Sequence, residues 1–318
     1  MDRSRTRLSL SIGLTLAALA TAGAATVFPL HAARWVADGF DPAKILSERP
    51  AECLTQAAEV EQAYKIELGR AAFRTPLLLG GQAARAGIAC DSCHRNGHNN
   101  PSFFFPGLSG KPGTADVTSS LFSSHRGDSV NNPLPIRDLS ATSDKLVILR
   151  NRQNPNLQTF IHGQITEEFN GAEPPPAVME GLAAYVRALS PDSCPANLNQ
   201  PVTVRSVMGE AVRAVRAADA ALTHKDSEAS LLMLSSARTQ LGLVHERFMA
   251  SDLSRELAAI EASDLGLSAL QAEIRGKKAD VSADLAIWQV EARRLAGLLE
   301  ASQKRSLFDP ARLAEAGR

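Results

Sequence analysis

The sequence predicts an all-α protein in two parts, a loop-rich first part and a helical second part. Of the seventeen prolines, sixteen lie at or before Pro201 and the last is Pro310. Residues 202–309 thus contain no proline, and they are rich in Ala, Leu, Arg and Glu, which favour helices. Before Pro201, short helical patterns alternate with loops rich in Gly, Pro and Asn.

Residues 1–32 are predicted to be a signal peptide or an N-terminal anchor. Three arginines within residues 1–7 precede an apolar run, and Ala22-Gly23-Ala24 offers a cleavage site. The rest of the chain is then periplasmic. Left uncleaved, residues 8–28 are long enough to anchor the protein in the inner membrane. Lys plus Arg equals Asp plus Glu, 34 each, so the chain has no net charge that would favour binding to nucleic acid.

The positions of prolines and of loop-forming residues divide the rest of the chain into segments. We predict a first domain over residues 45–195, a linker over 196–202, a helical bundle over 203–305 and a tail over 306–318. In the first domain, a helix over 54–73 precedes a short helix over 90–95, and a third helix over 178–189 closes the domain. The long loop over 96–138 between them is typical of a segment that wraps a ligand, and its Phe103–Phe105 triplet could pack against that ligand or in an ordinary core.

The segment Cys90-Asp91-Ser92-Cys93-His94 has the C-x-x-C-H pattern of covalent c-type haem attachment. Two thiols on one turn can form thioethers to the two haem vinyl groups, and His94 can then bind the iron as the proximal ligand. A thioredoxin-like motif and half of a zinc site are the alternatives. A zinc site would need a second close pair of ligands, and the two other cysteines stand alone. Motif and export together predict one covalent haem c.

Leu68-Gly69-Arg70-Ala71-Ala72-Phe73, followed by Ile88 to His94, resembles the first part of bacterial cytochrome c peroxidase and MauG-like haem domains. Residues 183–189 are similar to the last helix of those domains. The resemblance implies a cytochrome c-like haem domain in which the last helix crosses the first at Gly69. In this chain an antiparallel helical bundle follows that domain. Those peroxidases carry two haem motifs, whereas this chain has one and an added helical region.

Two functions follow from the single motif. The first is electron transfer by an exported mono-haem c-type cytochrome that exchanges electrons with a redox partner protein. The second is a cytochrome c peroxidase- or MauG-like enzyme that acts on peroxide. Peroxide reduction takes two electrons, and Trp35 and Trp288 both lie outside the predicted haem domain, so neither is an obvious second electron store. The single haem therefore favours electron transfer.

The sixth iron ligand has three candidates, and an open iron site is the alternative. His162 comes first, because its spacing from Tyr185 resembles that of the distal ligand in the family. His125, in the long loop, comes second, and Met179, at the start of the closing helix, comes third. His98 follows His94 by four residues and is expected on the proximal side of the haem.

Cys53 and Cys194 flank the first domain, and in an oxidising compartment they are expected to form a disulfide rather than remain as free thiols. Such a bridge would contribute about 4–5 kcal/mol by the chain-entropy model.

Four helical segments with apolar stripes make up the second part, separated by breaks at 225–227, 251–252 and 276–278. Short breaks between amphipathic helices indicate an antiparallel bundle. Its expected role is partner docking or spacing, and a second, non-covalent cofactor in its core is the alternative.

Overall fold

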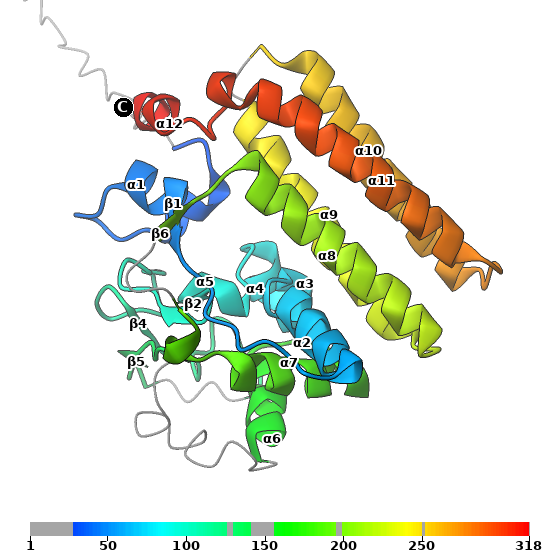
Figure 1. Ribbon diagram of the computed structural model, residues 1–318. Helices are drawn as coiled ribbons and strands as arrows, with labels where there is room; N and C mark the ends of the chain where they lie inside the picture. Colours follow the sequence, from blue (N-terminus) through cyan, green and yellow to red (C-terminus); the bar gives the residue numbers. More distant parts are fainter. Residues whose placement is uncertain (1–27, 126–129, 141–155, 195–198, 250–251, 318) are drawn as a thin grey trace, which may run out of the picture.

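The computed structural model describes residues 28–125, 130–140, 156–194, 199–249 and 252–317. The predicted signal or anchor therefore lies almost wholly outside the described residues. Within them the protein is mostly helical, which confirms the all-α class (Figure 1). No helix in these ranges is long and apolar enough to cross a membrane.

The first part consists of short helices joined by loops and by three two-stranded ribbons. After the 3₁₀ turn η1 (His31–Trp35), its helices are α1 (Pro42–Ser47), α2 (Val60–Phe73), α3 (Pro76–Leu79), α4 (Gly81–Arg85), α5 (Cys90–Cys93), α6 (Asn156–Gly163) and α7 (Pro176–Ala188). The antiparallel ribbons pair β1 (Glu48–Pro50) with β6 (Asn199–Pro201), β2 (His94–Arg95) with β3 (His98–Asn99), and β4 (Thr114–Ala115) with β5 (Leu134–Pro135). A single π-helical turn, Gln164–Glu168, follows α6, and a 3₁₀ turn, Pro191–Ser193, follows α7.

Helices α2 and α7 cross at a pair of glycines. A Cβ atom on Gly69 would collide with the carbonyl group of Gly181 and would lie 2.6 Å from the backbone nitrogen of Leu182. A Cβ on Gly181 would in turn lie 2.8 Å from the backbone nitrogen of Gly69. The two backbones are therefore in direct contact, as expected for Gly69 from the sequence.

Helix α2 begins later than predicted. The sequence favoured a helix from residue 54, but α2 starts at Val60. Leu54 instead forms a bridge with Leu189, and the Thr55 N–H donates to the Ala188 carbonyl oxygen over 2.8 Å. These contacts with the end of α7 hold the chain extended, so tertiary pairing outweighs the local helical preference.

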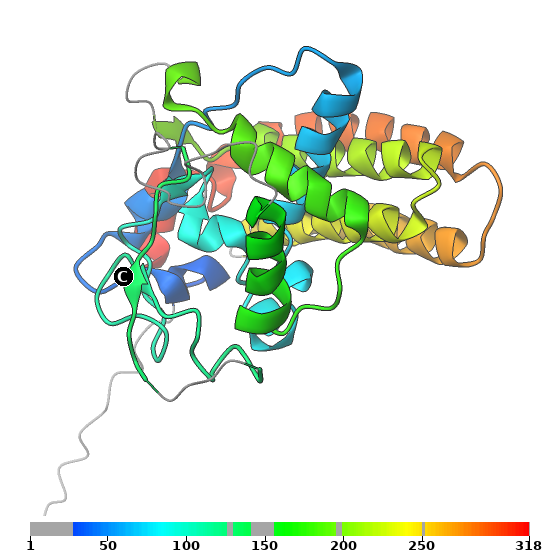
Figure 2. The same cartoon turned by 90° about the horizontal axis from the view of Figure 1, so that it is seen from below.

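The second part is a four-helix antiparallel bundle with the predicted breaks: α8 (Val204–Thr223), α9 (Ser227–Met249), α10 (Ser254–Arg275) and α11 (Val281–Ala301). Figure 2 shows these helices extending to one side of the first part. The carboxylate of Asp226 accepts from the Ala229 N–H over 2.9 Å and caps α9. Thr203 caps α8 in the same way by accepting from the Ser206 N–H.

The two parts share one continuous hydrophobic core. Helices α8 and α9 pack on α2, where the Ser236 hydroxyl donates to the Ala71 carbonyl oxygen over 2.9 Å. Of the predicted linker, residues 199–201 form β6, and residues 196–198 lie outside the described ranges. The predicted tail contains a helix, α12 (Pro310–Ala316), which packs on α1.

Candidate haem-attachment site

Helix α5 is a single turn that presents both thiols of the C-x-x-C-H motif. Cys90 and Cys93 are free, partly exposed and packed against the main core. The Ser92 hydroxyl accepts from the Ala89 N–H over 3.1 Å and caps the turn. Burial raises the pKa of both thiols to about 12, so they stay protonated at neutral pH. Two neighbouring free thiols on one turn can therefore react with the same ligand.

His94 is held in one orientation by a backbone carbonyl. Its Nδ1 lies 2.8 Å from the carbonyl oxygen of Arg137, which can accept a hydrogen bond but cannot donate one. Nδ1 therefore carries the proton, and the lone pair of Nε2 is left for a metal. Burial lowers the pKa of His94 and favours this neutral form. The ring of Phe73 packs 6.4 Å from the His94 ring, centroid to centroid.

A buried ionic network lies behind the motif. Asp91, inside the motif, pairs with Arg49 at 2.5 Å and lies 3.9 Å from the guanidinium of Arg74. Arg74 is buried and donates to Glu52 over 2.7 Å. The hydroxyl of Tyr185, on α7, donates to the same carboxylate over 2.7 Å. The C-x-x-C-H motif, the end of α2 and helix α7 thus meet at one set of charges.

The same network extends into the bundle. Arg70 donates to Glu52 over 2.6 Å and to Glu210 of α8 over 2.8 Å. The network contains three guanidinium groups and three carboxylates, those of Arg49, Arg70 and Arg74 and of Glu52, Asp91 and Glu210. Burial alone would raise the pKa of Glu52, but Arg74 and Arg70 hold that pKa well below its ordinary value. Sequence reasoning missed this network, although two arginines four residues apart in the otherwise apolar run 68–74 were a signal.

The three candidates for the distal ligand lie in different surroundings. His162 is on α6 with its side chain 38% exposed, and its Nε2 lies 2.8 Å from the Glu173 carboxylate. His125 is exposed in the long loop. Met179 is buried at the start of α7. The first choice from the sequence thus has one ring nitrogen engaged by a carboxylate, whereas the third lies in the core. The assignment of the distal ligand stays a prediction.

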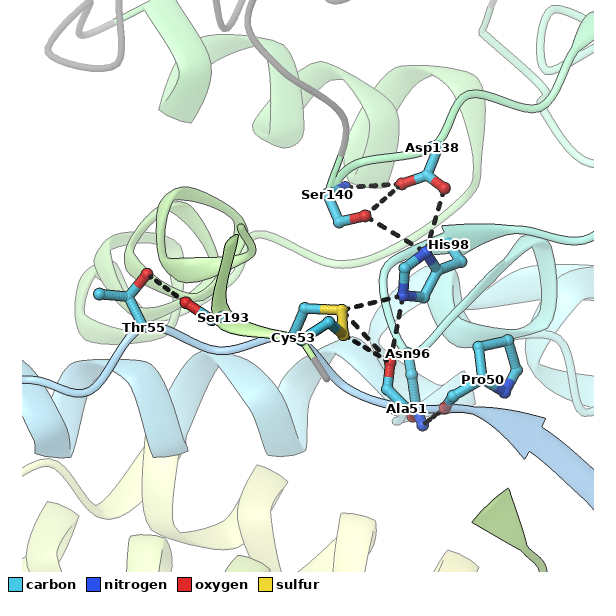
Figure 3. Close-up of a disulfide and its surroundings, with 10 residues drawn as sticks. Pro50, Ala51, Cys53, Thr55, Asn96, His98, Asp138, Ser140 and Ser193 are labelled. Atoms are coloured by element: carbon cyan, nitrogen blue, oxygen red, sulfur yellow. Dashed lines mark hydrogen bonds and ion pairs between the residues drawn. A yellow bond between two sulfur atoms is a disulfide. The ribbon is translucent and has the colours of Figure 1, made fainter. Parts of the chain in front are cut away.

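The structure joins Cys53 and Cys194 in the disulfide that the sequence predicts, with their Cα atoms 4.7 Å apart. His98 lies on β3, paired with the strand that carries His94, and its ring faces this disulfide (Figure 3). Its Nε2 lies 3.3 Å from the Cys53 sulfur, and its Nδ1 lies 3.0 Å from a carboxylate oxygen of Asp138. Sequence reasoning did not foresee this contact.

The long loop packs around an aromatic cluster. Phe103 and Leu108 are fully buried in the main core, and Phe105 stacks on Trp35 with ring centroids 4.3 Å apart. The indole N–H of Trp35 donates to the Ala86 carbonyl oxygen over 3.2 Å. Trp35 therefore packs on the first domain, although it precedes the predicted boundary at residue 45. The sequence analysis placed Trp35 outside the first domain by its position in the chain and did not predict this contact.

Comparisons with protein-family models, with curated proteins and with solved structures found no match to this chain.

Proposed function

We propose that this chain is an exported, periplasmic mono-haem c-type cytochrome that transfers electrons to or from a redox partner protein. Its first domain is then a cytochrome c-like haem domain of the kind found in bacterial cytochrome c peroxidases and MauG-like proteins. One observation carries the proposal. The C-x-x-C-H motif presents two free thiols on one turn, and the next residue, His94, is fixed with its Nε2 available for iron.

When bound, haem c would supply an iron centre that can gain or lose one electron. Cys90 and Cys93 would hold it through two thioether bonds. The Arg137 carbonyl would keep the ring of His94 in place and raise the basicity of Nε2. The glycine crossing of α2 and α7 brings Phe73 and Tyr185, whose ring centroids lie 5.1 Å apart, together beside the motif.

The first test is covalent attachment. We expect the protein, exported in a host with haem-attachment machinery, to give a haem-stained band at its own mass on a denaturing gel. Cys90→Ala combined with Cys93→Ala should abolish the stain. Cys53→Ser combined with Cys194→Ser is the matched control and should keep it, because those two cysteines form the disulfide. A colourless band from the unmodified protein would refute haem attachment.

The second test concerns the distal ligand and separates the two functions. Electron transfer predicts low-spin optical spectra in the ferric and ferrous states and background turnover of peroxide. His162→Gly should make the iron high-spin. If Met179→Leu has that effect instead, the ligand is Met179, which lies in the core.

A peroxidase- or MauG-like enzyme is the alternative function, and one observation favours it. Trp35 stacks on Phe105 of the haem domain, so an oxidisable side chain lies closer to the motif than its sequence position indicated. Fast peroxide turnover by the unmodified protein, lost in Trp35→Phe, would establish the enzyme and overturn the electron-transfer proposal.

A further inference from the structure

The two sulfurs of the Cys53–Cys194 disulfide differ in access to solvent. Cys53 is 1% exposed, and its carbonyl oxygen accepts from the Ser190 N–H over 2.8 Å. Cys194 follows the 3₁₀ turn after α7 and is partly exposed. An external thiolate attacks the sulfur that it can reach. The attacked atom is therefore the Cys194 sulfur, and Cys53 is the leaving group.

A histidine is positioned at the leaving sulfur. The Nε2 of His98 lies 3.1 Å from the Ala51 carbonyl oxygen and 3.3 Å from the Cys53 sulfur, so an N–H at this position faces both (Figure 3). On the other side of the ring, Nδ1 lies 3.0 Å from the Asp138 carboxylate. A proton on each nitrogen thus finds an acceptor, which favours the imidazolium form.

Asp138 is itself fixed. The Ser140 hydroxyl and the Ser140 N–H donate to its second carboxylate oxygen over 2.6 and 2.9 Å. The hydrogen bond that His98 donates to Asp138 raises the pKa of His98, so the ring is charged in a larger fraction of molecules near neutral pH. A cation next to a departing thiolate stabilises the negative charge, and its proton can be passed to the sulfur.

We propose that this disulfide is a thiol–disulfide exchange site, attacked at Cys194 by a dithiol, with His98 as the acid that protonates the departing Cys53 sulfur. In the first step the dithiol's thiolate forms a new S–S bond to Cys194. The Cys53–Cys194 bond breaks, its electron pair stays on Cys53, and the proton of Nε2 follows. In the second step the other thiol of the dithiol displaces Cys194, which leaves as a thiol after taking up a proton. The dithiol becomes a disulfide, and this chain gains two electrons and two protons.

The partner class follows from the two-step chemistry. A monothiol would leave Cys194 in a mixed disulfide until a second molecule arrived, whereas a dithiol completes the reaction within one encounter. This inference goes beyond the proposed electron transfer at the haem and does not depend on it.

The test measures how fast a small dithiol, dithiothreitol, reduces the disulfide in the full-length exported protein. Alkylation followed by mass mapping of the Cys53 and Cys194 peptides reads this bond alone, whatever the state of Cys90 and Cys93. A chelator is kept present, because the donor atoms of Cys53, His98 and Cys194 lie within 4.8 Å and could hold a metal ion once reduced.

We expect His98→Gln to slow reduction by about 100-fold, the low end of the range for a positioned general acid. Asp138→Asn, which keeps the ring but removes its charged partner, should slow it by a smaller factor. His245→Gln, in the bundle and paired with Glu261, is the matched control and should leave the rate unchanged. Equal rates for the unmodified protein and both site variants would overturn the role of His98.

A trapping experiment tests the direction of attack. In Cys53→Ser, the remaining Cys194 should form a mixed disulfide readily with oxidised glutathione. In Cys194→Ser, the buried Cys53 should react at least tenfold more slowly. Faster capture at Cys53 would refute the assignment of Cys194 as the attacked sulfur, and this readout does not require either variant to bind haem.

Discussion

Replacing Gly69 by alanine tests the helix crossing on which the first domain is built. The added Cβ would collide with the carbonyl group of Gly181 and would lie 2.6 Å from the backbone nitrogen of Leu182. Both neighbours are backbone atoms of α7, so no side-chain rotation can relieve the overlap. Helices α2 and α7 would have to move apart along their whole contact.

Two opposing effects set the magnitude. Alanine is favoured over glycine inside a helix by about 1 kcal/mol. Overpacking of a well-packed core costs about 1–3 kcal/mol, and a backbone collision belongs at or above the upper end of that range. We therefore expect a net loss of about 2 kcal/mol. At about 2–4 °C per kcal/mol for a chain of this size, the melting temperature should fall by about 4–8 °C.

Thermal unfolding followed by circular dichroism measures this difference. Gly297→Ala is the matched control, since Gly297 is also inside a helix, α11, and nothing lies within 4 Å of an added Cβ there. It should gain about 0.5–1 kcal/mol from helix propensity alone. An equal gain for Gly69→Ala would show that the two backbones are not in contact and would refute the reasoning.

Two further predictions concern charged groups. Glu52→Gln should lower the unfolding free energy by about 3–5 kcal/mol, because Arg70 and Arg74 would keep their buried charges without that carboxylate. Glu300→Gln is the control for the same denaturant titration and should have a much smaller effect, because its partner Arg205 is exposed to solvent. Asp138→Asn should reduce stability in a pH-dependent way. The His98 pKa is raised above its ordinary 6.5, so its contribution is full below pH 6.5 and is lost as the pH rises through the folded-state value. The Asp138 pKa is lowered from 3.8 to about 2, mainly through its hydrogen bond to His98 and against the effect of burial, so its contribution is lost as the pH falls toward 2. The melting-temperature difference between the protein and this variant should therefore be largest between about pH 4 and 6.5, and a difference that grows above pH 8 would contradict the pairing.

The bundle could be predicted from the sequence because its signals are local. Apolar stripes, capping residues and the absence of proline fix α8 to α11 within a few residues of their observed bounds. Gly69 was identified through a family resemblance, and the disulfide through the count of cysteines in a chain predicted to be exported. These features depend on residue types close in sequence or on simple pairing.

The contacts that were missed are all long-range. Residues 54–59 are helical by composition, but pairing with the end of α7 keeps them extended. Asp138 contacts His98 although they are forty residues apart in sequence, and Glu210 contacts Arg70 from the other part of the chain. Local patterns carry no information on which distant segment lies opposite, so neither the ionic network nor the surroundings of the disulfide could be derived.

The two ends of the described chain meet in a small separate core, which sets an order of folding. Leu30 and Ala43 pack there with Leu307 and Leu313, and Arg247 joins the ends by donating to the carbonyl oxygens of Leu46 and Leu307. The crossing of α2 and α7 can close once residue 188 has been made. The small core has to wait for residue 313, and closing so long a loop costs additional entropy. The C-x-x-C-H motif can therefore acquire its helical framework before residues 30–43 find their final partners.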